Sequence, residues 1–148
     1  MIAVIGIKKG DLMDRLKLSI NLLENRWADL ALITEKQEKT FYFERVPNDP
    51  IYDLLESAIK IFGRIDSTII FHNGSQREWL SVKSTENGMC RFETEGARLT
   101  VPIKQFSRAI LRMFDSYIFE FSLDDYNNQW GEFPKKDIEK LRNLCCSS

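Results

Sequence analysis

The sequence predicts a single α+β domain, residues 1–148, in which helices pack against an antiparallel sheet of about five to seven strands. Residues 67–101 contain short β-forming runs separated by turn sequences. Two longer segments, 50–62 and 102–121, carry apolar residues at three- and four-residue steps, as amphipathic helices do. Of the 148 residues, 43% are apolar, which is enough for one full hydrophobic core.

The first third of the chain is expected to form a strand, a helix and a hairpin. Residues 2–7 are apolar and largely β-branched, which favours a strand. Residues 11–26 place five apolar side chains near helical spacing, so they predict a helix. Residues 27–46 alternate apolar and polar positions around the charged turn EKQEK, a pattern typical of a β-hairpin.

The segment from 49 to 63 has the clearest helix boundaries. Asp49 can cap the free N–H groups, Pro50 suits the first helical position, and Gly63 can end the helix. The apolar side chains between them form one stripe, which must pack on another element, most simply a sheet.

Residues 67–101 predict three or four antiparallel strands. The runs STIIFHN, REWLSVKS, MCRFETE and ARLTV are separated by NGSQ, ENG and EG, which suit tight turns. Turns this short cannot join parallel strands. A long helix over 102–121 and a short closing helix over 134–144 complete the expected fold.

Charge and hydropathy exclude several classes of protein. The formal net charge is −1, whereas nucleic-acid-binding domains usually carry a basic excess, so nucleic acid is not the expected partner. The chain has no run of 18 apolar residues, and its N-terminus lacks the charged start and cleavage site of a secretory signal. We therefore expect a cytoplasmic protein without membrane contact.

The sequence contains no motif for a cofactor, a metal or catalysis. Gly6 and Gly10 are spaced too closely for a Walker-type phosphate loop. Cys145 and Cys146 are adjacent, whereas zinc sites separate paired cysteines by two to four residues, so we expect free thiols in a frayed tail. His72, the only histidine, has no nucleophile motif near it. We expect no cofactor, no bound metal and no enzymatic activity.

Arg77 and Trp79 fall on one face of a predicted strand. Arginine beside an aromatic side chain is common at protein interfaces and at nucleic-acid-binding surfaces. A tryptophan in the core beneath an edge arginine explains the same pattern, and we prefer this interpretation.

The segment from 115 to 132 holds five carboxylates and no lysine or arginine. Its net charge is −5, so the rest of the chain carries +4. Adjacent aspartates on a helix diverge by about 100°, and the spacing does not match a calcium loop, so metal chelation is not expected. The segment is either a solvated helix end and loop or an acidic surface for a basic partner. Its carboxylates are Asp115, Glu120, Asp124, Asp125 and Glu132.

Two features favour the partner interpretation. Carboxylates at the C-terminal end of the preceding helix are unfavourable with its dipole, which suggests that they serve a partner. Aromatic side chains lie among the acids, and aromatic anchors inside a polar rim are typical of protein interfaces. We predict that Tyr126 and Trp130 are the anchors and that the five carboxylates contact lysines or arginines of the partner.

The C-terminal third, from RLTVPIKQFSRAILRMFDSY to DDYNNQW, resembles bacterial immunity proteins of contact-dependent growth inhibition and other polymorphic toxin systems. The similarity is one of layout over residues 97–144: a strand, a long helix starting with a proline, an acidic aromatic loop and a short last helix. It includes no diagnostic motif and carries over no binding residue by position. The resemblance implies tight binding that blocks a cognate toxin, commonly a nuclease with a basic active site.

The sequence therefore predicts a non-enzymatic protein that binds and neutralises a toxin through an acidic aromatic surface. Two alternatives stay open: a small enzyme that uses the carboxylates, and a nucleic-acid-binding module built on Arg77, Trp79 and Lys83. Metal-dependent stability would favour the first, and binding that weakens steeply with salt would favour the second.

Overall fold

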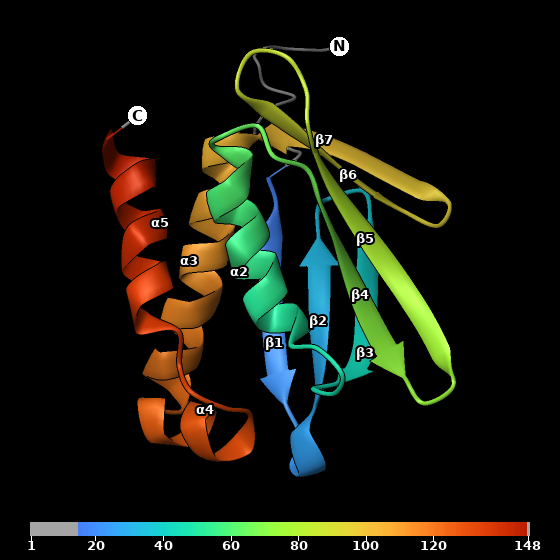
Figure 1. The fold of residues 1–148 in the computed structure, drawn as a ribbon, viewed down its shortest axis with the longest axis vertical. Coiled ribbons are helices and arrows are strands. Elements are labelled where there is room, and N and C mark those ends of the chain that lie inside the picture. The colour runs from blue at the N-terminus through green and yellow to red at the C-terminus, as the bar shows by residue number, and fades with distance from the viewer. Residues whose placement is uncertain (1–14, 148) are drawn as a thin grey trace.

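The computed structural model describes residues 15–147 (Figure 1). One antiparallel sheet contains strands β1 (Lys17–Leu22), β2 (Trp27–Ile33) and β3 (Glu38–Glu44) in that order. A second antiparallel sheet contains β4 (Ser67–Asn73), β5 (Gln76–Ser84), β6 (Met89–Thr94) and β7 (Ala97–Pro102), also in chain order. The helical elements are η1 (Glu24–Arg26), α2 (Pro50–Ile61), α3 (Ile103–Glu120), α4 (Leu123–Gln129) and α5 (Lys135–Ser147). The α+β class is confirmed, with the strands divided between two sheets.

The two sheets lie edge to edge, with β3 beside β4, and helices α2 and α3 pack on them (Figure 1). At this junction the rings of Phe41 and Phe71 stack with their centroids 4.1 Å apart. Helix α5 packs against α2 and α3 rather than on the strands. One hydrophobic core takes side chains from both sheets and from helices α2 to α5.

Strand β1 occupies part of the segment for which the sequence predicts a helix, so that prediction is wrong. Leu16, Leu18 and Ile20 are buried, whereas Lys17 and Ser19 between them are more exposed. This two-residue period is that of a strand with one buried face. The strand expected over residues 2–7 and the glycines Gly6 and Gly10 lie outside the described residues.

The other elements predicted for the N-terminal half are confirmed. Strands β2 and β3 form the expected hairpin. Helix α2 starts at Pro50, and the Asp49 carboxylate accepts a hydrogen bond from the Tyr52 N–H at 3.1 Å, as an N-cap does. The left-handed residue after this helix is Arg64, with φ 62°, rather than Gly63.

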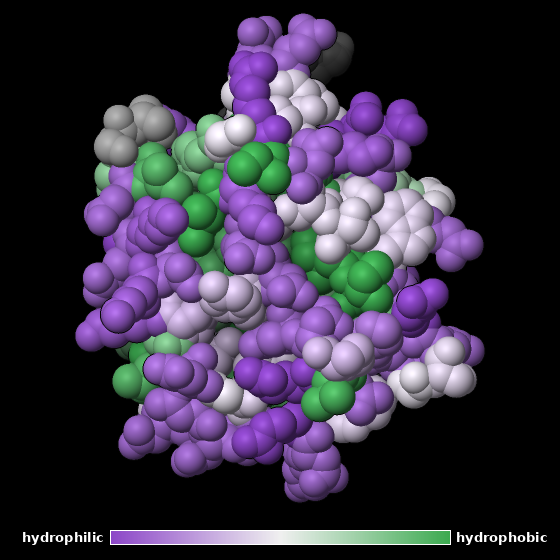
Figure 2. All heavy atoms as spheres, in the orientation of Figure 1, coloured by the Kyte–Doolittle hydropathy of each residue, from purple (hydrophilic) through white to green (hydrophobic). Residues whose placement is uncertain are grey.

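The C-terminal elements also follow the prediction, with one addition. Helices α3 and α5 form as expected, but residues 123–129 form a further helix, α4, where the sequence predicted a helix end and a loop. The three cysteines are free thiols, but Cys145 is buried in α5, so the expected frayed tail is wrong. The face that carries α2 is mostly hydrophilic, with hydrophobic atoms in small separate groups (Figure 2). None of the helices in residues 15–147 is long and apolar enough to cross a membrane.

Candidate functional site: an acidic corner at the end of helix α3

The acidic segment forms the turn from helix α3 into helix α4, near one end of the molecule (Figure 1). Ser122 lies at this turn, and its Oγ accepts a hydrogen bond from the Asp125 N–H at 3.0 Å. This bond caps α4 and fixes where the helix begins. We define the acidic corner as the exposed residues around this turn: Phe119, Glu120, Phe121, Leu123, Asp124 and Asp125.

Asp124 and Asp125 lie in the first turn of α4, and not at the C-terminal end of a helix as the sequence suggested. A negative charge at a helix N-terminus interacts favourably with the helix dipole. Their position therefore has a structural reason of its own and does not by itself argue for a partner. Glu120, the last residue of α3, is the carboxylate that has the unfavourable position.

The prediction that Tyr126 and Trp130 anchor a partner is wrong, because their side chains are only 1% and 0% exposed. The Trp130 Nε1–H donates a hydrogen bond to Asp49 Oδ1 at 2.9 Å, and its ring meets that of Phe43 edge-on. Tyr126 packs against Tyr117, with ring centroids 5.8 Å apart. Both residues pack in the core and so hold the adjoining acidic corner in place.

Further aromatic contacts hold the corner in one position. The Tyr126 ring lies 5.2 Å from that of Phe133, and Phe133 packs edge-on against Phe114 of α3. Burial raises the pKa of Tyr117, with an additional effect from the negative charge of Asp125. The acidic corner therefore rests on a packed aromatic layer, and its side chains are presented from a fixed backbone.

The two outer carboxylates of the segment have different surroundings. Asp115 forms an ion pair with Arg142 of α5 at 3.1 Å, so part of its charge is compensated within the chain. Glu132 lines a surface groove together with Arg45 and Lys135. The five predicted carboxylates are all exposed, but only Glu120, Asp124 and Asp125 belong to the acidic corner.

The corner also exposes apolar side chains that the sequence analysis missed. Phe119 is 93% exposed, Phe121 is 50% exposed and Leu123 is 45% exposed. The sequence contains a signal for Phe119, because it lies four residues after Asp115 and therefore on the polar side of α3. Phe121 is the last apolar residue of the helix predicted over 102–121, but the helix ends at Glu120 and the apolar stripe ends with it.

A second surface lies on the β4–β7 sheet. Trp79 is 40% exposed, so the preferred interpretation of a core tryptophan is wrong. Arg77 and Lys83 of the same strand are also exposed, and the two-residue period places all three on one face. His72 lies on the same face of the neighbouring strand, directly opposite Arg77. Arg77, Trp79 and Lys83, the residues on which a nucleic-acid-binding module would be built, therefore lie on one face of the sheet.

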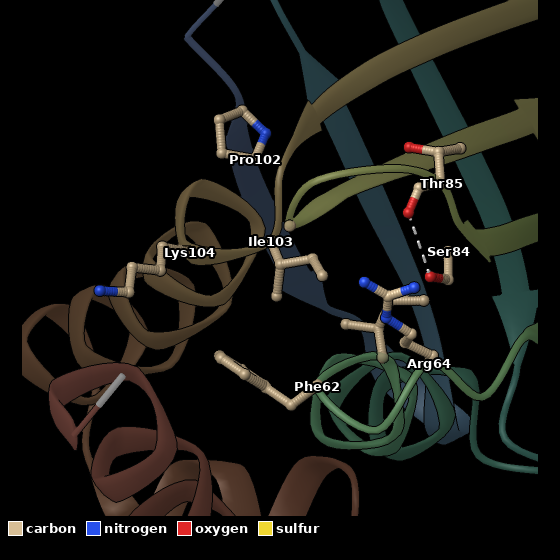
Figure 3. Close-up of a pocket in the computed structure, with 9 residues that line it drawn as sticks. Phe62, Arg64, Ser84, Thr85, Pro102, Ile103 and Lys104 are labelled. Atoms are coloured by element: carbon tan, nitrogen blue, oxygen red, sulfur yellow. Dashed lines mark hydrogen bonds between the residues drawn. The ribbon is translucent and has the colours of Figure 1, made fainter.

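A pocket of about 400 Å³ lies between the end of α2, the β5–β6 turn and the start of α3 (Figure 3). Phe62 and Ile103 give it apolar walls, Arg64 extends toward Ser84, and Lys104 points away. The described residues that line it include no carboxylate or imidazole that could act as a general base. Within residues 15–147, no three His, Cys, Asp or Glu side chains are grouped to hold a metal ion.

Comparison with models of known protein families, with curated proteins and with solved structures gave no match for this chain.

Proposed function

We propose that this protein is a cytoplasmic, non-enzymatic binding protein whose contact surface is the acidic corner. Its partner is a protein with a basic surface. The layout resembles that of immunity proteins of polymorphic toxin systems, which supports a cognate toxin as the partner. A nuclease with a basic active site is the kind of toxin that fits. Binding then neutralises the toxin by covering its active site.

The observation that carries this proposal is the exposure of Phe119, Phe121 and Leu123, which are interspersed in sequence with Glu120 and Asp124 around the turn from α3 to α4. Grouped apolar side chains on a surface mark interaction sites more often than isolated ones do. Covering one phenylalanine or leucine side chain contributes about 1.5–3 kcal/mol. These three apolar side chains can therefore act as the anchors of the contact surface. The buried side chains of Tyr126 and Trp130 cannot.

The electrostatics of the corner favour a basic partner. Glu120, Asp124 and Asp125 are exposed, and none of them forms an ion pair with a cation in the described part of the chain. Their charges are therefore available to lysines or arginines of another protein. Such charges mainly accelerate association and exclude acidic partners, while the apolar groups slow dissociation.

The test is capture of the partner from the native host with the tagged protein as bait, followed by affinity measurements with the purified partner. Phe119→Ala together with Leu123→Ala is expected to weaken binding by roughly thirtyfold or more, as loss of central anchors does. Asp124→Lys with Asp125→Lys is expected to lower the association rate and its dependence on salt.

The matched control is Glu35→Lys with Glu86→Lys, which makes the same charge change at exposed turn residues away from the corner. This control is expected to bind the partner almost as the parent protein does. If it loses affinity as strongly as the corner variants, or if the corner variants bind normally, the acidic corner is not the contact surface. A captured toxin that stays fully active in the complex contradicts the neutralising function.

A further inference from the structure

The outward face of the β4–β7 sheet combines an exposed tryptophan with a group of cations. Trp79 lies on the inner strand β5, directly opposite Ile70 of β4, and Arg77 lies opposite His72. Lys83 lies opposite Arg91 of the other inner strand, β6. The register therefore places these side chains on one face of the sheet, and Arg98 of β7 lies on the same face. The cations of this face are Arg77, Lys83, Arg91 and Arg98.

Glu93 is the carboxylate that forms ion pairs with these cations among the residues that the structure describes. It is 3.9 Å from Lys83, 3.2 Å from Arg91 and 3.5 Å from Arg98. One carboxylate cannot neutralise four cations, so the group of charged side chains carries +3 at a pH where all five are ionised. The group is therefore positively charged, although the net charge of the whole chain is −1.

The arrangement is unfavourable without an anion. Like charges directly opposite each other on neighbouring strands destabilise a sheet, and Lys83 and Arg91 form such a pair. The Arg91 Nε is buried and lies 3.2 Å from Glu93 Oε1, but it forms no hydrogen bond with any of residues 15–147. A bound phosphate would supply the missing negative charge.

We propose that this face binds single-stranded nucleic acid, with a base stacked on Trp79 and the phosphates held by the surrounding arginines and Lys83. An open sheet with an exposed aromatic ring between cations suits unpaired bases, whose faces are accessible. In a duplex the faces of the bases are stacked on one another and cannot reach the Trp79 ring. An acidic protein has no base that could stack on it. This proposal does not rest on the function assigned to the acidic corner, which is built from other elements.

The test uses the full chain and a fluorescein-labelled oligo(dT) of about 12 nucleotides, with binding followed by fluorescence anisotropy. Trp79→Ala is expected to weaken binding roughly ten- to a hundredfold, whereas Trp79→Phe keeps a stacking ring and retains most of the affinity. Arg77→Glu with Lys83→Glu is expected to remove most binding. Because two to four phosphates would be neutralised, the logarithm of the affinity should fall with a slope of about −1.4 to −2.8 against the logarithm of salt concentration.

Arg108→Glu with Arg112→Glu is the matched control, since it makes the same charge change on exposed residues of α3. An equal loss of affinity in this control would mean that only the overall charge matters, and would overturn the proposal. The proposal also fails if the oligonucleotide does not bind at low salt, if a matched duplex binds as well, or if Trp79→Ala binds normally. Displacement of the oligonucleotide by an equal concentration of polyglutamate would show that the face takes an acidic protein instead.

Discussion

Asp49 joins two parts of the chain that are 81 residues apart in sequence. Its Oδ1 accepts one hydrogen bond from the Tyr52 N–H, which caps α2, and another from the Trp130 Nε1–H. The cap was predictable, because it depends on residues next to each other in the chain. The bond to Trp130 was not, because nothing local in the sequence tells a buried tryptophan from an exposed one.

Replacing Trp130 by phenylalanine tests the structural role of this side chain. The change removes one of the two hydrogen bonds to Asp49 Oδ1 and opens a small cavity, so the free energy of unfolding should fall by about 1–3 kcal/mol. Urea denaturation measures this change. Trp79→Phe, on the exposed sheet face, is the control and should alter stability by about 0.5 kcal/mol or less. Equal effects of the two substitutions would contradict the assigned roles.

Tyr52 offers a prediction about pH. Its hydroxyl donates a hydrogen bond to Asp137 Oδ2 at 2.8 Å, and this bond, with burial and the nearby negative charge, raises the pKa of Tyr52 from 10 to about 12. The folded state therefore holds the phenol proton more tightly than the unfolded state. The resulting stability is present below pH 10 and is lost as the pH rises through 12.

Asp137→Asn should lower the pKa of Tyr52 toward 10, because the negative charge that favours the protonated phenol is removed. NMR of ring-labelled tyrosine follows the titration of this residue separately from the others. A titration midpoint that is unchanged by the substitution would show that the charge of Asp137 does not control this pKa.

At the scale of the elements, those with strong local signals were predicted and those with ambiguous ones were not. Helix α2 has a cap, a first-turn proline and one apolar stripe, and the strands from β4 to β7 are delimited by turns. Residues 16–20 place apolar side chains at positions that fit a strand as well as a helix, and pairing with β2 decides in favour of the strand. Helix α4 is too short to show a period, and its formation depends on the Ser122 cap and the burial of Tyr126.

Ser122→Ala tests this explanation of α4. Loss of the bond to the Asp125 N–H should destabilise the helix by about 1 kcal/mol and speed amide hydrogen exchange in residues 123–129 severalfold. Ser116→Ala, an exposed serine on the preceding helix, is the control and should leave exchange in α4 unchanged. Unchanged exchange in the Ser122 variant would show that packing alone maintains the helix.

At the scale of the whole molecule, charge is distributed unevenly in spite of a net charge of −1. The acidic corner lies at the junction of α3 and α4, and the cationic face lies on the β4–β7 sheet. The sequence was sufficient to find the acidic segment, since no lysine or arginine lies among its five carboxylates. It could not show which aromatic side chains are exposed, because that depends on the packing of α4 and Phe133 against α3.

Because the two surfaces are built from different elements, their variants should act independently. Arg77→Glu with Lys83→Glu, which is expected to remove binding to oligo(dT), should change the affinity for the protein partner less than threefold, in line with the additivity of distant sites. Calorimetry with the purified partner measures this. A large loss of partner affinity in this variant would mean that the partner reaches the sheet face.

The most direct test of the acidic corner is hydrogen–deuterium exchange of the protein alone and in complex with its captured partner. We expect slower exchange in the complex over residues 117–126, with little change in the strands from β4 to β7. Slower exchange confined to those strands, or to the groove beside Glu132, would contradict the placement of the partner at the acidic corner.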